Sequence, residues 1–372
     1  MPTSVDTSGW KLPINLGLND GTYCSQRVID VLLEHNTRTS LRNYSDGDNS
    51  ELREILAKEC GCRPENIYLH NGSGPILKQV LPHVIRRQIK SSAKRIVKHV
   101  ISKQGYPIIT PVWTYGKVPL KALASGLSVR LVPLRWEEDF ELHVDELEAA
   151  IRKGDGLVYL SSPNNPTGNV LIQREQLQPL MSRYPGSTFW IDEAYVQYVS
   201  RREHRYLVDL VVEHPNMLCT RTFSFAYGMA AVRIGYLVAS EELVQALEGQ
   251  VTNYRVPLLA ERMGIAAAQD AQHLEDVRER SAEARAYIQQ RLARHGNLKV
   301  FPSVANFLLV RVMDAPRSQE IAAGLLERGV KVKTFAPLKE HDFSHFFRIT
   351  IGTPEENEFL CDMLDELEDP QA

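Results

Sequence analysis

The sequence lacks a long apolar run, an excess of either charge and a paired cysteine motif, and each absence excludes a class of protein. No apolar stretch approaches the roughly 20 residues that cross a bilayer, so we expect no membrane span and no membrane partner. The 43 basic and 46 acidic residues give a net charge of −3, which provides no general attraction for nucleic acid. The N-terminus, Met1 to Asp6, has no basic segment followed by an apolar one, so no secretory signal is predicted.

The five cysteines are too few and too scattered to form a disulfide framework. An odd, dispersed set is typical of reduced thiols, and it predicts a cytoplasmic location. Cys60 and Cys62 are separated by a single residue, which is shorter than the spacing of a zinc knuckle, and no second pair follows them. We therefore predict structural cysteines and no metal site.

What is present is the composition of an ordinary globular protein, with 43% hydrophobic and 24% charged residues in a chain of 372. That length supports a large core and two domains. No internal repeat or low-complexity tract interrupts the chain. Short apolar strands alternate with longer amphipathic helices through its middle, a pattern typical of an α/β fold with a mostly parallel sheet flanked by helices.

Particular segments give this pattern its elements. The predicted strands of the large sheet are Asn66–His70, Gly156–Leu160, Thr188–Ile191 and Arg233–Ala239. After the first of them, Gly72-Ser73-Gly74 leads into a helix that has Pro75 in its first turn. Beyond about residue 245 long helices precede a smaller α+β unit. Its predicted elements are strands Lys299–Phe301, Asn306–Val312, Val330–Thr334 and Phe346–Ile351, helix Ser318–Arg328, and a last helix opened by the capping box Thr353-Pro354-Glu355-Glu356.

Polar residues follow two of the predicted strands, at the sheet edge where ligands bind in open α/β folds. One strand runs into Ser162–Gly168 (SPNNPTG), and another ends at Asp192. A carboxylate at the end of an apolar strand is costly to bury unless a cation or several donors meet it. Taken alone, such an aspartate is more often a helix cap or loop anchor than a catalytic group.

Four motifs in a fixed order favour a functional role for Asp192 over a structural one. They are Ser162-Pro163-Asn164-Asn165-Pro166-Thr167-Gly168, Asp192-Glu193-Ala194-Tyr195, Arg221-Thr222-Phe223-Ser224-Phe225-Ala226-Tyr227-Gly228 and Arg233-Ile234-Gly235-Tyr236. With Arg348-Ile349-Thr350-Ile351-Gly352-Thr353, this set resembles the fold-type I aminotransferases that depend on pyridoxal phosphate (PLP), most closely the histidinol-phosphate aminotransferase branch. The resemblance covers roughly residues 10 to 365. It implies an N-terminal arm with part of the small domain in 1–45, a large cofactor-binding domain in 46–250, and an interdomain helix with the small domain in 251–372.

The resemblance also implies a cofactor site. Asp192 would bond the pyridine nitrogen and keep it protonated, which lets the ring accept electron density. Asn165 and Tyr195 would donate to the phenolic oxygen of PLP, and Trp113 would stack on the ring. The residues implied for the phosphate are the Ser73 and Gly74 amides, the Thr222 and Ser224 hydroxyls, and Arg233.

The substrate implied by the resemblance is a small molecule with an amine and a carboxylate. Arg348 would bind the α-carboxylate bidentately, and Tyr23 would contact the substrate. Tyr44 matches a tyrosine that one subunit lends to its partner's site, so a homodimer is implied. Taken alone, each of these residues also has a structural interpretation, as a packed side chain, a helix cap or a solvated charge.

One position departs from the pattern. The family's Schiff-base lysine stands eight residues before the phosphate arginine, and counting back from Arg233 gives Phe225. A phenyl ring can neither bond the cofactor nor move a proton, so an ordinary transaminase cycle with covalently held PLP is not expected. PLP or pyridoxamine phosphate would then be held non-covalently.

Two hypotheses stay open on the sequence. The first is an enzyme, a transferase or lyase, that uses PLP or pyridoxamine phosphate without a lysine; Tyr195, Tyr115, Tyr23, His70, Lys78 or Lys117 would be its proton shuttle. The alternative is a non-catalytic or cofactor-free protein that uses the same pocket for a phosphorylated carboxylate metabolite. The basic run from Arg86 to Lys98 is interpreted as a solvated helix face, with a phosphate-rich partner as the other interpretation.

Overall fold

A computed structural model describes the chain in eight segments and one isolated residue. These are residues 11–34, 42, 49–90, 106–124, 127–200, 205–249, 256–315, 317–336 and 341–368. Tyr44 and most of the basic run that ends at Lys98 lie outside the described residues.

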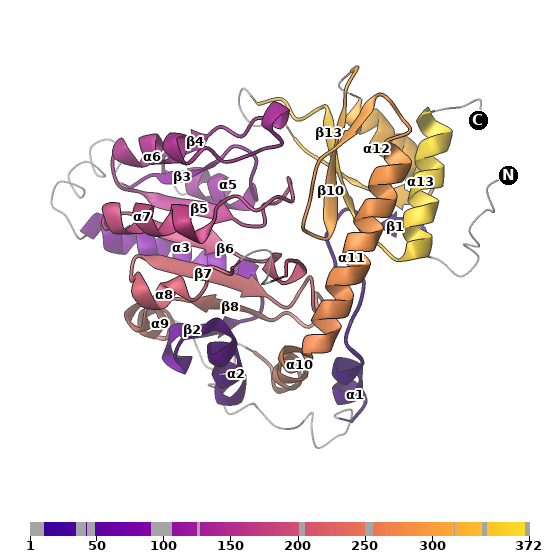
Figure 1. Ribbon diagram of the computed structural model, residues 1–372. Helices are drawn as coiled ribbons and strands as arrows, with labels where there is room; N and C mark the ends of the chain where they lie inside the picture. The colour runs from indigo at the N-terminus through magenta and orange to yellow at the C-terminus, as the bar shows by residue number, and fades with distance from the viewer. Residues whose placement is uncertain are drawn as a thin grey trace.

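A seven-stranded sheet forms the centre of the larger unit (Figure 1). Its order is β2-β8-β7-β6-β5-β3-β4, and only β8 runs antiparallel to its neighbours. The strands are β2 (Ile67–His70), β3 (Ile108–Pro111), β4 (Val129–Val132), β5 (Leu157–Ser161), β6 (Thr188–Asp192), β7 (Met217–Thr222) and β8 (Gly235–Val238). This confirms the predicted α/β fold with a mostly parallel sheet.

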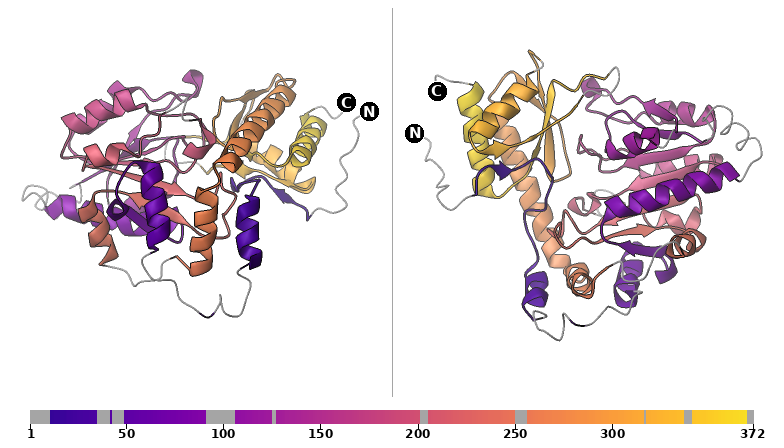
Figure 2. Two further views of the ribbon diagram at one scale, coloured as in Figure 1. Left: turned by 60° about the horizontal axis from the view of Figure 1, so that its bottom comes forward. Right: turned by 180° about the vertical axis from the view of Figure 1, so that it is seen from behind.

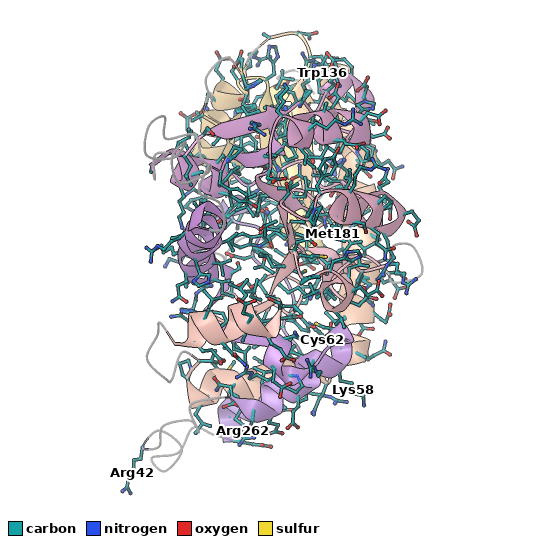
Figure 3. The ribbon with its side chains drawn as sticks, turned by 90° about the vertical axis from the view of Figure 1, so that its left-hand side faces the viewer. Arg42, Lys58, Cys62, Trp136, Met181 and Arg262 are labelled. Carbon is teal, nitrogen blue, oxygen red and sulfur yellow. The ribbon has the colours of Figure 1, made fainter. Side chains whose placement is uncertain are left out.

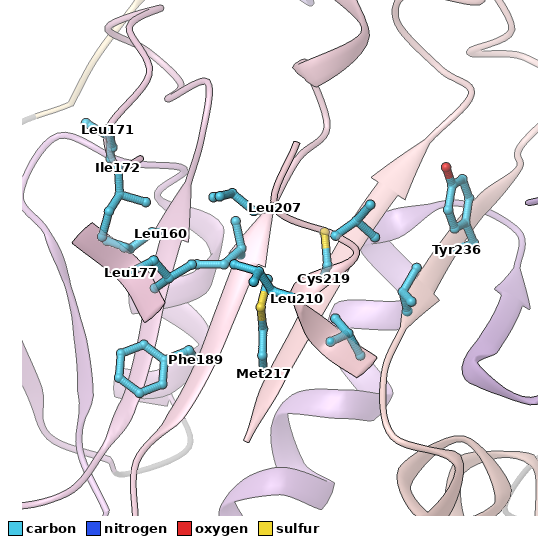
Figure 4. Packing of buried hydrophobic residues seen from close by; sticks show 14 of the residues in the cluster. Leu160, Leu171, Ile172, Leu177, Phe189, Leu207, Leu210, Met217, Cys219 and Tyr236 are labelled. Carbon is cyan, nitrogen blue, oxygen red and sulfur yellow. The ribbon is translucent and has the colours of Figure 1, made fainter. Parts of the chain in front are cut away.

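The strands are apolar on both faces because helices cover both sides of the sheet. In β5, Val158 and Leu160 pack into one core while Leu157 and Tyr159 pack into the opposite one. Figure 4 shows part of the first core, where side chains of β5, β6 and β7 meet those of the helices on that face. A sheet buried on both faces therefore requires continuous apolar runs, in which alternate residues point into opposite cores.

Two groups of helices form the covering layers (Figure 2). The first group packs on the face of Tyr159 and consists of α3 (Ser73–Lys90), α5 (Lys117–Ala124) and α9 (Glu241–Glu248). The second packs on the face of Leu160 and consists of α2 (Ser50–Cys60), α6 (Val144–Arg152), α7 (Arg174–Arg183), α8 (Leu210–Glu213) and α10 (Leu258–Ala268). Seen from the side in Figure 3, Trp136 lies at one end of the molecule and Arg262 of α10 at the other, with Met181 of α7 between them.

The smaller unit is built on a four-stranded antiparallel sheet in the order β12-β13-β10-β9. Its strands are β9 (Leu298–Val300), β10 (Phe307–Val312), β12 (Lys333–Thr334) and β13 (Phe346–Thr350). The helices beside it are α11 (Ala271–Leu292), α12 (Ser318–Glu327) and α13 (Pro354–Glu368). In β13, Phe347 and Ile349 pack against these helices, whereas Phe346 joins the core of the larger unit, so Arg348 and Thr350 share the face of Phe346.

The N-terminal part of the chain belongs to both units. Strand β1 (Ile14–Asn15) pairs in parallel with β11 (Val330–Lys331), and α1 (Gln26–Glu34) packs against α10. The predicted single strand Val330–Thr334 is therefore wrong, because the chain changes sheets at Val332: β11 bonds β1 while β12 bonds β13. The capping box is confirmed, with Thr353 N donating to Glu356 Oε2 at 2.8 Å and Glu356 N to Thr353 Oγ1 at 3.2 Å.

None of the described helices is long and apolar enough to cross a membrane.

Candidate functional site

The predicted site residues lie where β5, β6 and β7 end, at the edge of the sheet that also receives the start of α3. Ser161 is paired with Asp192 across β5 and β6, and Asp192 with Thr220 across β6 and β7. Because these strands are parallel, their carboxyl ends place the SPNNPTG loop, the Asp192–Tyr195 turn and the Phe225 loop side by side. The motifs that are spread over 67 residues, from Ser162 to Gly228, thus form one surface.

Asp192 is a half-buried carboxylate held by neutral groups. Tyr159 donates to its Oδ2 at 2.8 Å and Thr220 to its Oδ1 at 3.1 Å. Burial raises the pKa of Asp192, and these two hydroxyl bonds work in the opposite direction. Among the described residues no basic side chain forms an ion pair with it. A cationic N–H on a ligand would supply the missing partner.

Tyr195 receives two hydrogen bonds on its hydroxyl oxygen. Asn19 Nδ2 donates at 3.0 Å and Asn165 Nδ2 at 3.2 Å. Burial raises the pKa of Tyr195 to about 12, while the charge of Arg348 and the bond from Asn19 lower it. The phenol is therefore neutral at physiological pH, and its O–H is available to an acceptor in the site.

Arg348 is a buried cation without an anionic partner in the described part of the chain. Its side chain is 6% exposed, and its Nη1 and Nη2 donate at 2.7 Å to Asn165 Oδ1 and Gly17 O. Its Nε is buried with no hydrogen bond, and burial lowers the pKa of the guanidinium. A guanidinium held only by neutral acceptors, with a donor unused, suits a carboxylate or phosphate ligand.

Tight backbone packing surrounds the start of α3. Gly72 has a φ of 104°, and a Cβ added there would strike the guanidinium of Arg233. A Cβ on Gly235 would lie 2.6 Å from Ser73 N. Arg233 is exposed and bonds Ala230 O at 2.9 Å. The N–H groups at a helix start beside an exposed guanidinium form a setting that fits a phosphate.

Thr222 and Ser224 lie next to this region and are bonded to each other. Thr222 Oγ1 lies 3.0 Å from Ser224 Oγ and accepts from Ser224 N at 3.1 Å. Both side chains are buried. Their role as phosphate donors stays a prediction, since each hydroxyl already has a partner within the loop.

Phe225 fills space against Tyr195. The two rings stack at a centroid distance of 4.5 Å and an angle of 15°. The loop that carries Phe225 packs closely against the segment of Gly21 and Tyr23. A Cβ added to Gly21 would strike Phe225 O, and a Cβ added to Gly228 would strike Tyr23 O. Among the described residues no lysine forms a hydrogen bond or ion pair with Asp192 or Tyr195.

Trp113 and Tyr23 face partners other than these polar groups. The Trp113 indole packs edge-to-face against Phe343 and Phe346 of the smaller unit, at centroid distances of 4.3 and 4.5 Å. Tyr23 lies under the guanidinium of Arg280 at 4.9 Å and lines a cavity of about 540 Å³ between α11 and α13. Stacking of Trp113 on a ring and contact of Tyr23 with substrate therefore stay predictions.

Three residues at the site were not singled out from the sequence as site residues: Asn19, Tyr159 and Thr220. A tyrosine inside a strand that is buried on both faces needs a hydrogen-bond partner, and that signal points to Tyr159. The contact between Asn19 and Tyr195 spans 176 residues and leaves no local signal. In the described part of the chain, no group of three or more His, Cys, Asp or Glu side chains could hold a metal ion.

Comparison with known proteins agrees with this geometry. The profile of aminotransferase class I and II matches residues 11–364. Histidinol-phosphate aminotransferase of Methanosarcina mazei is 32% identical over 346 residues, covering 93% of this chain and 85% of that protein. The enzyme of the same name from Brevibacillus brevis is 31% identical over 330 residues, covering 88% of this chain and 83% of that protein.

Solved structures share the fold. Histidinol-phosphate aminotransferase of Sinorhizobium meliloti, solved in complex with pyridoxal 5′-phosphate, superimposes with a TM-score of 0.81 at 24% identity and covers 97% of this chain and 92% of that one. A protein from Erwinia carotovora atroseptica, described as a possible enzyme of this kind, also gives 0.81, at 21% identity, and covers 96% and 97%. The matched length and the identity to the curated relatives show that this chain belongs to the aminotransferase class I and II family.

Proposed function

We propose that this chain binds PLP or pyridoxamine phosphate without a covalent anchor and acts on a small substrate that carries an amine and a carboxylate. The observation that carries the proposal is the pair of unmatched charges around Tyr195. Asp192 lacks a cation and Arg348 lacks an anion among the described residues, and both charges act on the Tyr195 hydroxyl. A ligand with a protonated ring nitrogen and an anionic end satisfies both.

The residues present fit the cofactor at three places. Asp192, pointing from the end of β6, would hold the pyridine N–H. The amides of Ser73 and Gly74 at the start of α3, with Arg233, would hold the phosphate. The Tyr195 O–H, with Asn165 beside it, would donate to the ring's phenolic oxygen. When bound, the cofactor supplies a ring that accepts electron density from the substrate carbon.

Arg348 would hold and orient the substrate. Its Nε is buried without a hydrogen-bond partner, and its bond to Asn165 joins it to the residue that also contacts Tyr195. An anion bound there would therefore lie beside the ring that Asp192 holds. The homodimer and the partner's tyrosine, implied by the motif around Tyr44, belong to the same proposal.

Phe225 sets the mode of binding in this proposal. It offers no amine, so the cofactor would be retained by hydrogen bonds and ion pairs alone. Proton movement at the substrate would fall to a hydroxyl such as that of Tyr195, whose pKa of about 12 keeps it protonated at physiological pH.

The stack of Phe225 on Tyr195 also favours a second candidate function. An aromatic ring that fills the position of an amine suits a protein that binds a phosphorylated carboxylate and does no chemistry on it. Arg348 and the start of α3 would hold the two anionic groups of such a ligand.

An absorption spectrum tests the two functions. The purified protein is titrated with PLP and with pyridoxamine phosphate, dialysed, and then treated with candidate amino acids, with borohydride reduction as the control for covalent attachment. A bound chromophore that is lost on dialysis and shifts only when an amine is added supports the first function. No binding at saturating cofactor contradicts it and turns the search to phosphorylated carboxylates.

A gain-of-function variant sharpens this test. In Phe225→Lys the new amine condenses with the aldehyde of PLP and releases water, and borohydride then fixes the bond as a secondary amine. We expect one phosphopyridoxyl group per chain, located at residue 225 by peptide mass spectrometry. Phe225→Leu is the matched control, because it opens the same stack without adding an amine, and it should carry no label. Equal labelling of the two variants would contradict the assigned position.

A further inference from the structure

The hydroxyl of Tyr195 is the meeting point of two asparagines from distant parts of the chain. Asn165 belongs to the loop after β5, and Asn19 precedes α1. Each side-chain amide donates an N–H to the same oxygen, at 3.2 and 3.0 Å. The resemblance to known aminotransferases implies a role at the cofactor for Asn165, whereas it implies no such role for Asn19.

Each asparagine is fixed in turn by a side chain of β13. Arg348 Nη1 donates to Asn165 Oδ1 at 2.7 Å, and Thr350 Oγ1 donates to Asn19 Oδ1 at 3.0 Å. Because Arg348 is only a donor, its bond also fixes which end of the Asn165 amide points to Tyr195. Arg348 and Thr350 are two residues apart on one face of the strand, so one rigid element holds both amides.

Asn19 is held more firmly than a loop residue requires. It is 1% exposed and adopts a left-handed conformation with a φ of 62°. Its N–H donates to Thr350 Oγ1 at 3.0 Å, and its C=O accepts from Asn306 at 3.1 Å. All four of its polar groups are thus bonded: two to Thr350 of β13, one to Asn306, which precedes β10, and one to Tyr195 in the larger unit.

This arrangement decides where the Tyr195 proton points. A phenol oxygen has two acceptor positions and one donor, and the two asparagines use both acceptor positions. The O–H must then donate in the remaining direction, and no described residue accepts it. We propose that Asn19 is a positioning residue that, paired with Asn165, turns the Tyr195 hydroxyl into an obligatory donor to the bound ligand and links it to β13. This inference rests on the proposed function, in which that ligand is the cofactor ring.

The test compares two ligands that differ in one hydroxyl. PLP carries the ring oxygen that Tyr195 would reach, and 3-deoxypyridoxal 5′-phosphate lacks it. Asn19→Gly removes the amide while tolerating the left-handed backbone. We expect it to weaken PLP binding by about twofold to tenfold, the range for one hydrogen bond, and to leave the affinity for the deoxy ligand unchanged. Dissociation constants come from quenching of protein fluorescence.

Two further variants keep the test independent of folding defects. Asn19→Asp preserves size but replaces a donor by an acceptor, so the Tyr195 O–H turns toward it, and PLP affinity should fall further than in Asn19→Gly. Thr350→Val removes only the hydroxyl that fixes Asn19 and should weaken PLP selectively as well. Asn66→Ala is the control: it deletes a buried amide bond of 2.9 Å to Ala239 O, away from the site, and should lower stability without changing either affinity.

A double-mutant cycle completes the experiment. In a Tyr195→Phe background, Asn19→Gly should cause no further loss of PLP affinity, because the oxygen that it positions is gone. A loss that persists in that background, or an equal loss for both ligands, overturns the inference and leaves the proposed function standing. A wild-type protein that binds neither ligand overturns the proposed function and the inference together.

Discussion

Replacing Arg348 by methionine should abolish recognition of an anionic group while leaving the stability of the protein almost unchanged. The reason is that Arg348 is already costly to bury. It is 6% exposed, its described partners are the neutral Gly17 O and Asn165 Oδ1, and its Nε has no partner. Burial of a charge without an opposite charge costs several kcal/mol even after the surroundings relax.

Arg348→Met makes two opposing contributions to the free energy of unfolding. Arg348→Met removes that charge and keeps a side chain of similar length. It also leaves two acceptors without their donors, at about 1–3 kcal/mol each when no water replaces them. Because the gain and the loss are of similar size, the free energy of unfolding should change by less than about 2 kcal/mol. Loss of a buried charged contact to a ligand costs about 2–5 kcal/mol, or about 30-fold to several thousand-fold in Kd.

The assay separates the two effects. Urea unfolding gives the change in stability, and spectral titration in the presence of PLP compares L-amino acids with the matching amino alcohols, which lack the carboxylate. The wild type should prefer the amino acid, and Arg348→Met should lose that preference. Arg311→Met is the control, because Arg311 on the neighbouring strand β10 lies over the Trp136 ring at 3.9 Å and should not affect the preference. A preference that survives in Arg348→Met, or a loss of stability of many kcal/mol, would refute the electrostatic reasoning.

Three other changes test the surroundings of the site. Gly235→Ala places a Cβ 2.6 Å from the first amide nitrogen of α3. It should lower the free energy of unfolding by about 1–3 kcal/mol and weaken binding of phosphate-bearing ligands. In Gly74→Ala the added Cβ has no atom within 4 Å, so this variant should bind the ligands normally in the same titration. Arg221→Met leaves the carboxylate of Glu193 buried without its cation, both side chains being 0% exposed, and should lower the free energy of unfolding by about 3–5 kcal/mol in urea. Hydrogen bonds, chiefly the one from Arg183, hold the pKa of the Glu148 carboxyl at about 2, below its ordinary 4.5. Its contribution to stability is present above pH 4.5 and is lost as the pH falls toward 2, so Glu148→Gln should flatten the acid limb of stability measured between those values.

The sequence predicts four of the seven strands of the large sheet, β2, β5, β6 and β8, and does not predict β3, β4 and β7. Each of the four predicted strands is a short apolar run, and burial on both faces makes the run continuous rather than alternating. The edge that gathers Asp192 and the SPNNPTG loop follows from the parallel direction of the strands alone. The reversal of β8 does not follow, since an apolar run has no direction.

The smaller unit shows where local pattern fails. Val330–Thr334 has the composition of one strand, yet it is shared between two sheets because β1, some 300 residues earlier, bonds its first half. Pairing over such a distance depends on the final arrangement of the units and not on the segment itself. The same reason hides Asn19, whose partner Thr350 is 331 residues away.

The unmatched charges near Phe225 and Tyr195 argue for a site that binds a ligand. Arg348 is buried and Asp192 is half-buried, and neither meets an opposite charge in the described part of the chain. Each therefore lowers the stability of the unliganded fold, and a chain that served only as a scaffold would gain stability from neutral residues at both positions. Phe225 offers no amine, but both unmatched charges are present, together with the two asparagines that donate to Tyr195. The cost of keeping these groups is offset only when a ligand brings a cation to Asp192 and an anion to Arg348 at the same time.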